Sequence, residues 1–354
     1  LFSDSVYIDR LSRIPAVMEM PYNDIIRKFI DMYAGRLRNQ VSFMLSACNF
    51  YMPIFEEALD AYGLPLELRY LPIIESALNP SAVSRAGASG LWQFMIGTGK
   101  IYGLESNSLV DERRDPIKAT WAAARYLKEM YDIYGDWNLV IAAYNCGPGT
   151  INKAIRRANG ETDYWKIYNY LPKETRGYVP AFIAANYVMT YYCDHNICPM
   201  ETNIPASTDT VQVNKNLHFE QIADLCNVPL DQIKSLNPQY KKQIIPGDNK
   251  PYTLRLPIEA ISTFIDRQDT IFAHRADELF RNRKTVAVKE ISPSTRRAAT
   301  AVAGKGKPTY YKIKSGDTLS SIAEKYGVRV KDIQRWNGMS NTKIAAGKRL
   351  KIYK

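Results

Sequence analysis

Apolar residues in positions 1–200 recur at intervals of three and four, the spacing that is typical of amphipathic helices. This pattern predicts helices over residues 43–59, 119–134, 139–144 and 178–192. Pro65 is placed to open a further helix that ends before Asn79-Pro80, because proline suits the first helical turn and disfavours helix in the residue before it. The first part of the chain is therefore predicted to be mainly helical.

The pattern changes after Asn203, where short runs of strand-like residues replace the helical spacing. Strands are expected over residues 210–213 and 253–256, with helices over 219–226 and 230–236 between them. The same order of strand, helix, helix and strand recurs over residues 310–313, 317–326, 330–336 and 349–352. The chain thus contains two copies of a unit of about 45 residues, which form an internal repeat.

An amphipathic helix is expected between the two copies, over residues 258–280, followed by a stretch rich in Lys, Arg, Ala, Thr, Ser and Gly. Residues 281–308 show no periodicity, which is typical of a flexible basic linker. We therefore expect an α+β multidomain protein. Its parts are a mainly α domain at 1–203, a small βααβ module at 204–257, the helix and linker at 258–308, and a second βααβ module at 309–354.

The net charge of the 354 residues is +11, and this charge is concentrated at one end of the chain. Residues 281–354 hold 19 Lys and Arg against 4 Asp and Glu, whereas the rest of the chain is slightly acidic. Such a segment is attracted to a polyanion, whether nucleic acid, anionic lipid or an acidic cell-wall polymer, or else serves only to keep the surface solvated.

No stretch of the sequence approaches the ~18 apolar residues of a membrane-spanning helix, which argues against an integral membrane protein. The chain begins with Leu1 rather than Met, as expected if a targeting segment carrying a membrane tether had been removed. The five cysteines are an odd and sparse set for a disulfide-rich fold. Three interpretations of Cys193 and Cys198 stay open: a disulfide, a metal site with His195, or free thiols.

The main candidate for a catalytic residue is Glu75. It lies near the end of an otherwise apolar predicted helix with the sequence Leu71-Pro72-Ile73-Ile74-Glu75-Ser76. The negative end of the helix dipole and burial both disfavour an ionised carboxylate, so the pKa of Glu75 is expected to be raised. A carboxylic acid that stays protonated near neutral pH can donate a proton to a leaving group. The alternative is a structural glutamate that is hydrogen-bonded to a neighbour.

Two further segments accompany this acid. A glycine-rich loop, Gly87-Ala88-Ser89-Gly90-Leu91-Trp92-Gln93, would let the backbone approach a ligand closely. Ala142-Ala143-Tyr144-Asn145 ends an apolar helix just before Gly147-Pro148-Gly149, so Tyr144 and Asn145 either point into a cleft or serve as a core tyrosine and a helix cap. Nucleotide-binding and zinc-protease motifs are absent, and three histidines give little support to a Ser-His-Asp triad.

Taken together, Glu75-Ser76, Gly90-Leu91-Trp92-Gln93 and Ala143-Tyr144-Asn145 have the order and spacing of the lytic murein transglycosylases with a goose-lysozyme-like fold. Over residues 20–195 the chain most resembles the membrane-bound D group of this family. Residues 311–319, which read Tyr-Lys-Ile-Lys-Ser-Gly-Asp-Thr-Leu, resemble the opening of the LysM module. The first copy of the repeat departs from that opening, because Val213-Asn214-Lys215-Asn216-Leu217 lacks the Gly-Asp-Thr turn.

The resemblance implies that Glu75 is the only catalytic carboxylate. It would protonate the glycosidic oxygen between N-acetylmuramic acid and N-acetylglucosamine and then accept a proton from the C6 hydroxyl, leaving a 1,6-anhydro end. Substrate would be bound by Ser76, Ser84, Gln93, Met95, Tyr126, Tyr144, Asn145 and Glu174, unless Glu174 only pairs with Lys173 or Arg176. In the second module, glycan would be bound by Ser315, Gly316, Asp317, Thr318, Asn341 and Ile344. Neither a cofactor nor a metal is implied.

The expected partner is the glycan strand of peptidoglycan in a bacterial cell envelope, on the periplasmic side and in association with the outer membrane. Nucleic acid is not an expected partner, and the oligomeric state is not predicted. A hydrolytic muramidase on the same fold is one alternative, although it would usually need a second carboxylate to activate water. A non-catalytic peptidoglycan-binding protein is the other. The modules either bind sugar or only pack against the catalytic domain.

Overall fold

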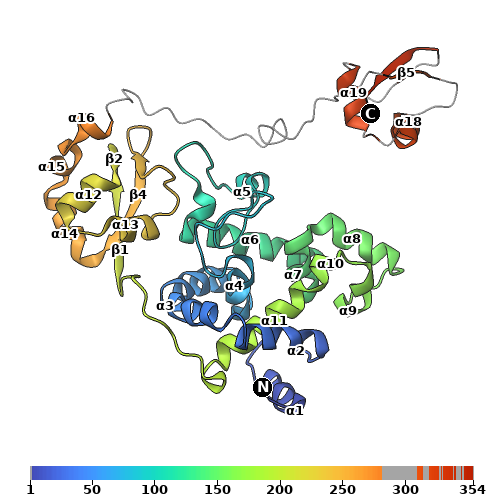
Figure 1. Ribbon diagram of the computed structural model, residues 1–354, viewed down its shortest axis with the longest axis horizontal. Helices are drawn as coiled ribbons and strands as arrows, with labels where there is room; N and C mark the ends of the chain where they lie inside the picture. Colours follow the sequence, from blue (N-terminus) through green and yellow to red (C-terminus); the bar gives the residue numbers. More distant parts are fainter. Residues whose placement is uncertain are drawn as a thin grey trace. The chain divides into compact units, whose positions relative to one another are not determined.

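The computed structural model describes residues 2–280, 309–313, 319–326, 328, 330–337, 339, 344 and 347–353. The chain divides into two compact units, Leu1–Ile291 and Ser292–Lys354 (Figure 1). The segment 281–308, predicted as a basic linker, lies outside the described residues.

The first 200 residues form a helical domain, as predicted. Its helices are α1 (Asp4–Ser12), α2 (Asp24–Ala34), α3 (Arg38–Ala61), α4 (Leu71–Ser76), α5 (Ile96–Ile101), α6 (Pro116–Tyr134), α7 (Trp137–Cys146), α8 (Pro148–Arg157), α9 (Tyr164–Ile167), α10 (Lys173–Arg176) and α11 (Tyr178–Thr190). Short 3₁₀ helices span Leu66–Tyr70, Glu112–Arg114, Tyr168–Tyr170 and Cys193–His195. Helix α11 is buried over most of its length and packs against α2, α4 and α7, so it forms the centre of the domain.

The helix expected to begin at Pro65 is divided into a 3₁₀ helix at Leu66–Tyr70 and the short helix α4. Pro72 lies in the first turn of α4, and its missing N–H favours a new helix start at this point. Six helices of this domain were not predicted, namely α1, α2, α5, α8, α9 and α10. The start of α2 does carry a sequence signal, because the Asn23 side chain accepts hydrogen bonds from the N–H groups of Ile25 and Ile26.

The first βααβ module follows the helical domain within the same compact unit. It consists of β1 (Thr208–Val213), β2 (Asn216–His218), α12 (Phe219–Cys226), α13 (Leu230–Leu236), β3 (Ile244–Pro246) and β4 (Tyr252–Pro257). Strands β1 and β4 pair antiparallel, with Val211 opposite Leu254, and β2 and β3 pair with Leu217 opposite Ile245. The sequence pattern predicted β1 and β4 but not the three-residue strands β2 and β3.

The single amphipathic helix predicted over residues 258–280 is wrong. The chain instead forms three short helices, α14 (Ile258–Asp266), α15 (Gln268–Ala273) and α16 (Ala276–Leu279). The backbone turns at Arg267 and again at Arg275, which is left-handed with φ of 50°. These turns let Phe264 and Ile271 both enter the core of the first module, so this segment belongs to the module rather than to a linker.

The second module has the predicted order of elements. Strand β5 (Thr309–Lys312) pairs antiparallel with β6 (Arg349–Ile352), and the helices α18 (Leu319–Tyr326) and α19 (Val330–Trp336) lie between them in the sequence. The residues Ser315, Gly316, Asp317, Thr318 and Asn341, predicted to bind glycan, lie outside the described residues. Ile344 is half-buried and packs against the small core of the module.

One asparagine shows at atomic detail that the two modules are copies. In the first module, Asn237 donates to the carbonyl oxygens of Ile233 and Arg255 and accepts from the N–H of Arg255. In the second module, 100 positions later, Asn337 makes the same three bonds to Ile333 and Lys351. In both modules the amide therefore ties the end of the second helix to the closing strand.

Candidate active site

Glu75 is the next-to-last residue of α4, and the backbone changes direction immediately after it. Ala77 and Leu78 are both left-handed, with φ of 51° and 58°, a conformation that side chains other than glycine adopt rarely. Such conformations cost about 1–3 kcal/mol each and persist only where the surroundings enforce them. The turn ends the helix within one residue of Ser76, so Glu75 stays at the negative end of the helix dipole.

A cavity of about 420 Å³ lies directly over this helix end. It is lined by Tyr33, Leu37, Gln40, Met44, Ile73, Ile74, Glu75, Ser76, Ala77, Ala82, Val83, Ser84 and Gln93. Four residues of the predicted site, Glu75, Ser76, Ser84 and Gln93, thus share one cavity. Among the lining residues, all of which the structure describes, Glu75 carries the one acidic side chain.

The surroundings of Glu75 raise its pKa to about 7. Burial is the largest cause, because it penalises the charged carboxylate, and the negative charge of Glu174 acts in the same direction. The hydroxyl of Tyr178 donates a hydrogen bond to Oε1 of Glu75 and lowers the pKa in part. The result is a carboxyl group that is close to half-protonated at neutral pH and can both donate and accept a proton.

Tyr178 was not among the predicted site residues. It is the first residue of α11, 103 positions after Glu75, and its own pKa is raised well above the usual range by burial and by the nearby Glu75. The phenol therefore remains a hydrogen-bond donor throughout the neutral pH range. The sequence offers only a weak signal for this contact, an aromatic residue directly after Gly177 at the start of an apolar helix.

The glycine-rich loop is fixed beside the cavity by hydrogen bonds to its own carbonyl groups. Ser76 Oγ donates to the carbonyl oxygen of Leu91 at 2.9 Å, and Tyr144 donates to that of Trp92 at 2.7 Å. Gln93 is left-handed, with φ of 50°, and its side-chain amide donates to the carbonyl oxygen of Gly90 at 2.8 Å. These contacts assign Ser76 and Tyr144 to shaping the loop.

The remaining predicted residues lie outside the cavity lining. The ring of Tyr126 is 5.4 Å from that of Tyr144, and Asn145 Oδ1 accepts a hydrogen bond of 2.9 Å from the Thr175 hydroxyl. Met95 is exposed directly before α5. Ser84, which does line the cavity, accepts a hydrogen bond at Oγ from the N–H of Ala88 at 3.0 Å.

The alternative for Glu174, an ion pair with Lys173 or Arg176, is not observed in the part of the chain that the structure describes. Arg176 instead donates to the carbonyl oxygens of Leu171 and Asn169. Glu174 is exposed, and its charge is felt at Glu75.

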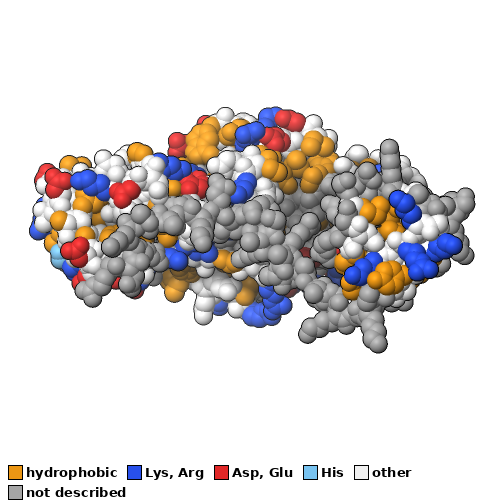
Figure 2. All heavy atoms as spheres, turned by 90° about the horizontal axis from the view of Figure 1, so that it is seen from above, with side chains coloured by type: hydrophobic (Ala, Val, Ile, Leu, Met, Phe, Trp, Pro, Cys, Tyr) orange, Lys and Arg blue, Asp and Glu red, His pale blue; other side chains and the backbone are white. Residues whose placement is uncertain are grey.

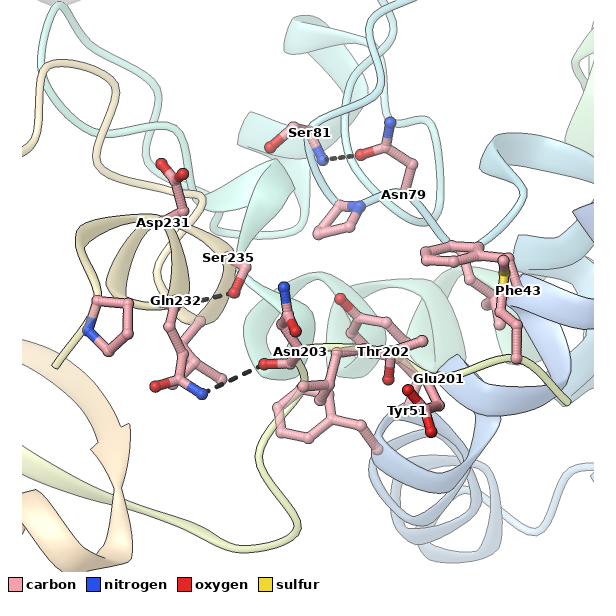
Figure 3. Close-up of a pocket in the computed structure, with 17 residues that line it drawn as sticks. Phe43, Tyr51, Asn79, Ser81, Glu201, Thr202, Asn203, Asp231, Gln232 and Ser235 are labelled. Atoms are coloured by element: carbon pink, nitrogen blue, oxygen red, sulfur yellow. Dashed lines mark hydrogen bonds between the residues drawn. The ribbon is translucent and has the colours of Figure 1, made fainter.

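A larger cavity, of about 890 Å³, lies elsewhere in the first unit, between α3, the segment 78–81, residues 200–204 and α13 (Figure 3). Phe43 and Tyr51 form one side, and Asp231, Gln232 and Ser235 form the other. Its acidic side chains, Glu201 and Asp231, are both exposed, and Asp231 pairs with Lys234 at 3.1 Å. Size alone would favour this cavity, but its acids lack the burial that proton transfer at neutral pH requires.

No group of three or more His, Cys, Asp or Glu able to hold a metal ion occurs within the described residues. Cys193 and Cys198 are both exposed and carry free thiols, so the structure contains neither the disulfide nor the metal site considered for them. Searched over the same described residues, the helices include none long and apolar enough to cross a membrane.

Three family models match the chain. Residues 52–167 match the transglycosylase SLT domain, residues 207–273 match the LysM-like domain of lytic transglycosylase MltD, and residues 311–352 match the LysM domain. The membrane-bound lytic murein transglycosylase D of Escherichia coli K12 is 31% identical over 341 residues, which are 95% of this chain and 70% of the relative. The chain belongs to the membrane-bound lytic murein transglycosylase D family. It is therefore a lytic murein transglycosylase, an enzyme of the cell envelope that binds peptidoglycan.

Two further matches cover smaller shares of the chain. The soluble lytic murein transglycosylase of Escherichia coli K12 is 33% identical over 124 residues, covering 33% of this chain and 19% of that protein. The match to the crystal structure of the 70 kDa soluble lytic transglycosylase from Escherichia coli covers 40% of this chain and 24% of the matched chain. The sequence identity is 29% and the TM-score is 0.36. The fold class predicted from the sequence, a lysozyme-like helical domain with small LysM regions after it, is confirmed by the family models.

Proposed function

We propose that this enzyme cleaves the β-1,4 bond between N-acetylmuramic acid and N-acetylglucosamine without water, with Glu75 as the single catalytic acid and base. The observation that carries the proposal is the raised pKa of Glu75, about 7, in a cavity that contains no second carboxylate among its described lining residues. A hydrolase would usually need a second acid at the site to activate water.

The reaction requires two proton transfers through the same carboxyl group. Protonated Glu75 first donates its proton to the glycosidic oxygen, so that the C1–O bond breaks and the N-acetylglucosamine end leaves with a new hydroxyl group. The resulting carboxylate then accepts the proton of the muramyl C6 hydroxyl, whose oxygen forms the new bond to C1. Glu75 ends the cycle protonated, and the 1,6-anhydro product forms within one sugar, where proximity favours ring closure.

Tyr178 serves the carboxylate that exists between these two transfers. Its hydroxyl group donates to Oε1 of Glu75, a bond that is stronger to the ionised form than to the neutral acid. Gln93 and Ser84 line the same cavity and supply polar groups for sugar hydroxyls. Met95, Tyr126, Asn145 and Glu174 are assigned to more distant parts of the substrate, with Glu174 at the end that carries the muramyl side chain.

Product analysis of purified sacculi tests the proposal. Wild-type enzyme is expected to release muropeptides that end in 1,6-anhydro-N-acetylmuramic acid, identified by mass spectrometry, and the Glu75→Gln variant is expected to release none. Glu201→Gln is the matched control, because Glu201 is an exposed acid in the larger cavity. Reducing N-acetylmuramic acid ends from the wild type would show hydrolysis, and full activity of Glu75→Gln would show that another acid is used.

The second module is proposed to hold the enzyme on the wall by binding glycan. Lys and Arg side chains gather on the face of this module that Figure 2 shows, and Lys312, Lys348 and Arg349 are among its exposed residues. These cations would add attraction to an anionic wall polymer, and tethering raises the effective concentration of substrate at the active site. We place the enzyme in the periplasm with a tether to the outer membrane, which cell fractionation tests.

A further inference from the structure

We propose that the LysM-like module, residues 207–273, holds the glycine-rich loop of the active site in its working position through a buried Asp111–Arg113 ion pair. Asp111, Arg113 and Lys241 are then positioning residues for the reaction. The inference rests on the proposed function, because it concerns the same site, and it gives the first module a role other than packing or sugar binding.

Residues 105–111 of the helical domain insert into the module and make direct contacts with it. Leu109 and Val110 belong to the helical domain by sequence, yet they are 2% and 0% exposed within the hydrophobic core of the module. The backbone N–H of Asp111 donates to the carbonyl oxygen of Gln239 at 2.9 Å. The N–H of Lys241 donates to that of Leu109 at 2.8 Å, so the two backbones run side by side.

Lys241 extends this contact towards the active site. Its Nζ donates to the carbonyl oxygen of Asn107 at 2.6 Å and lies 3.8 Å from Oδ2 of Asp111. Asp111 in turn binds Arg113 through two parallel hydrogen bonds, both of 2.8 Å, in the two-pronged geometry that arginine and carboxylate favour. The side chains of Asp111 and Arg113 are only 2% and 5% exposed, so the pair is shielded from water.

Arg113 contacts both ends of the glycine-rich loop. Its Nη1 donates to the carbonyl oxygens of Gly87 and Phe94, each at 2.9 Å. The backbone of Arg113 also touches the middle of the loop, because a Cβ added at Gly90 would lie 1.7 Å from the Arg113 carbonyl oxygen. Gln93, which lines the cavity of Glu75, is carried by this loop, so the position of Arg113 sets the position of a cavity wall.

These contacts form a continuous connection from the module to the active site. A buried guanidinium group stays in place only while its counter-charge is in place, since an unpaired charge in the interior is costly. The module covers Asp111 and places Lys241 beside it. Any loosening of the module therefore loosens the carboxylate that orients Arg113, and with it the loop that shapes the cavity.

The internal repeat supports this assignment of the first module. The loop around Lys241 corresponds in sequence to the region of Asn341 in the second module, but here it is engaged by the helical domain. The segment 213–217, which corresponds to the LysM opening, is packed against residues 247–248. The N–H and the side chain of Asn216 both bind Asp248, and a Cβ on Gly247 would lie 2.3 Å from the Lys215 carbonyl oxygen. In the first module, both this segment and the loop around Lys241 are thus in contact with other parts of the protein.

The test compares neighbouring lysines in the full chain. Lys241→Met removes the cation beside Asp111, and Lys242→Met is the matched control, because Lys242 is exposed and makes no ion pair among the described residues. Turnover is measured on soluble glycan strands, well below the melting temperature, with the folded fraction taken from circular dichroism. We expect Lys241→Met to lower kcat about tenfold and to leave KM within about twofold, because the glycine-rich loop would be displaced from its working position. Lys242→Met is expected to match the wild type.

Two further variants keep the test decisive. Asp111→Asn preserves shape but removes the charge, and it is expected to lower kcat like Lys241→Met, whereas Lys241→Arg is expected to restore most of the activity. An unchanged kcat in Lys241→Met, a change in KM alone, or a loss that only follows the folded fraction would each overturn the inference. Wild-type product analysis and Glu75→Gln report on the proposed function separately, so failure of one conclusion is distinguishable from failure of the other.

Discussion

Replacing Glu75, the proposed catalytic acid, is expected to make the folded protein more stable at alkaline pH. In the native state Glu75 has a pKa of about 7, against 4.5 for an ordinary glutamate. Between these two values the unfolded chain has lost the proton and the folded chain has kept it. Unfolding then releases a proton, so the free energy of unfolding that Glu75 contributes falls as the pH rises from 4.5 to about 7.

The size of the effect follows from the difference between the two pKa values. One unit corresponds to about 1.4 kcal/mol, so the full difference corresponds to about 3 kcal/mol above pH 7. Glu75→Gln removes this cost, because the amide has nearly the same shape, carries no charge and can still accept from Tyr178. The variant is therefore expected to exceed the wild type by up to about 3 kcal/mol at pH 8, and by almost nothing at pH 4.

Urea unfolding at pH 4, 6 and 8, followed by circular dichroism, measures this difference. Comparing variant and wild type at each pH cancels the contributions of all other titrating groups. Glu201→Gln is the control, since its exposed carboxylate is expected to leave the difference near zero at every pH. A difference between Glu75→Gln and the wild type that does not change with pH, or that falls as the pH rises, would refute the burial of the acid and the function built on it.

Three other outcomes are expected. Tyr178→Phe removes the hydrogen bond that lowers the Glu75 pKa. The pH at which kcat/KM falls on the alkaline side should therefore rise by about one to two units. Tyr170→Phe, at an exposed tyrosine, should leave the pH profile unchanged. Gly90→Ala should lower the free energy of unfolding by more than about 3 kcal/mol, because φ of Gly90 is +89° and the added Cβ would overlap a backbone oxygen. Gly149→Ala, where the added Cβ would meet no other atom, should change the free energy of unfolding by less than about 1 kcal/mol. Deleting residues 292–354 should weaken binding to sacculi in a co-sedimentation assay and leave turnover of short soluble glycan strands intact.

Much of the fold could be predicted because it depends on local pattern. The helices α3, α6, α7 and α11 bury one apolar stripe each or are apolar throughout, and both signals are visible in any short window of sequence. The prediction of a single helix over residues 258–280 was wrong for the opposite reason. Its apolar spacing is helical over its whole length, yet Phe264 and Ile271 reach the core only because the chain bends at Arg267, which tertiary packing decides.

The candidate site divides in the same way. Glu75 was singled out because a charged residue at the end of an apolar helix is unusual, and Gln93 was assigned to the site through its position in the Gly90-Leu91-Trp92-Gln93 motif that resembles the family. Tyr178 could not be found by such reasoning, because its contact with Glu75 joins two helices that are 103 positions apart. The connection from Lys241 to the glycine-rich loop could not be predicted for the same reason, because it passes through three segments that no local sequence pattern connects.

A single carboxyl group that must act first as acid and then as base works best when its pKa is near the working pH, because neither proton transfer is then strongly uphill. Burial alone would raise the pKa of Glu75 further and leave a poor proton donor, whereas the Tyr178 hydrogen bond alone would lower it and leave the group ionised. The two effects oppose each other at one carboxyl group. Under the proposed function, catalysis would depend on the closed packing of α4, α11 and the glycine-rich loop as much as on Glu75 itself, and we therefore expect residues outside the cavity to control turnover.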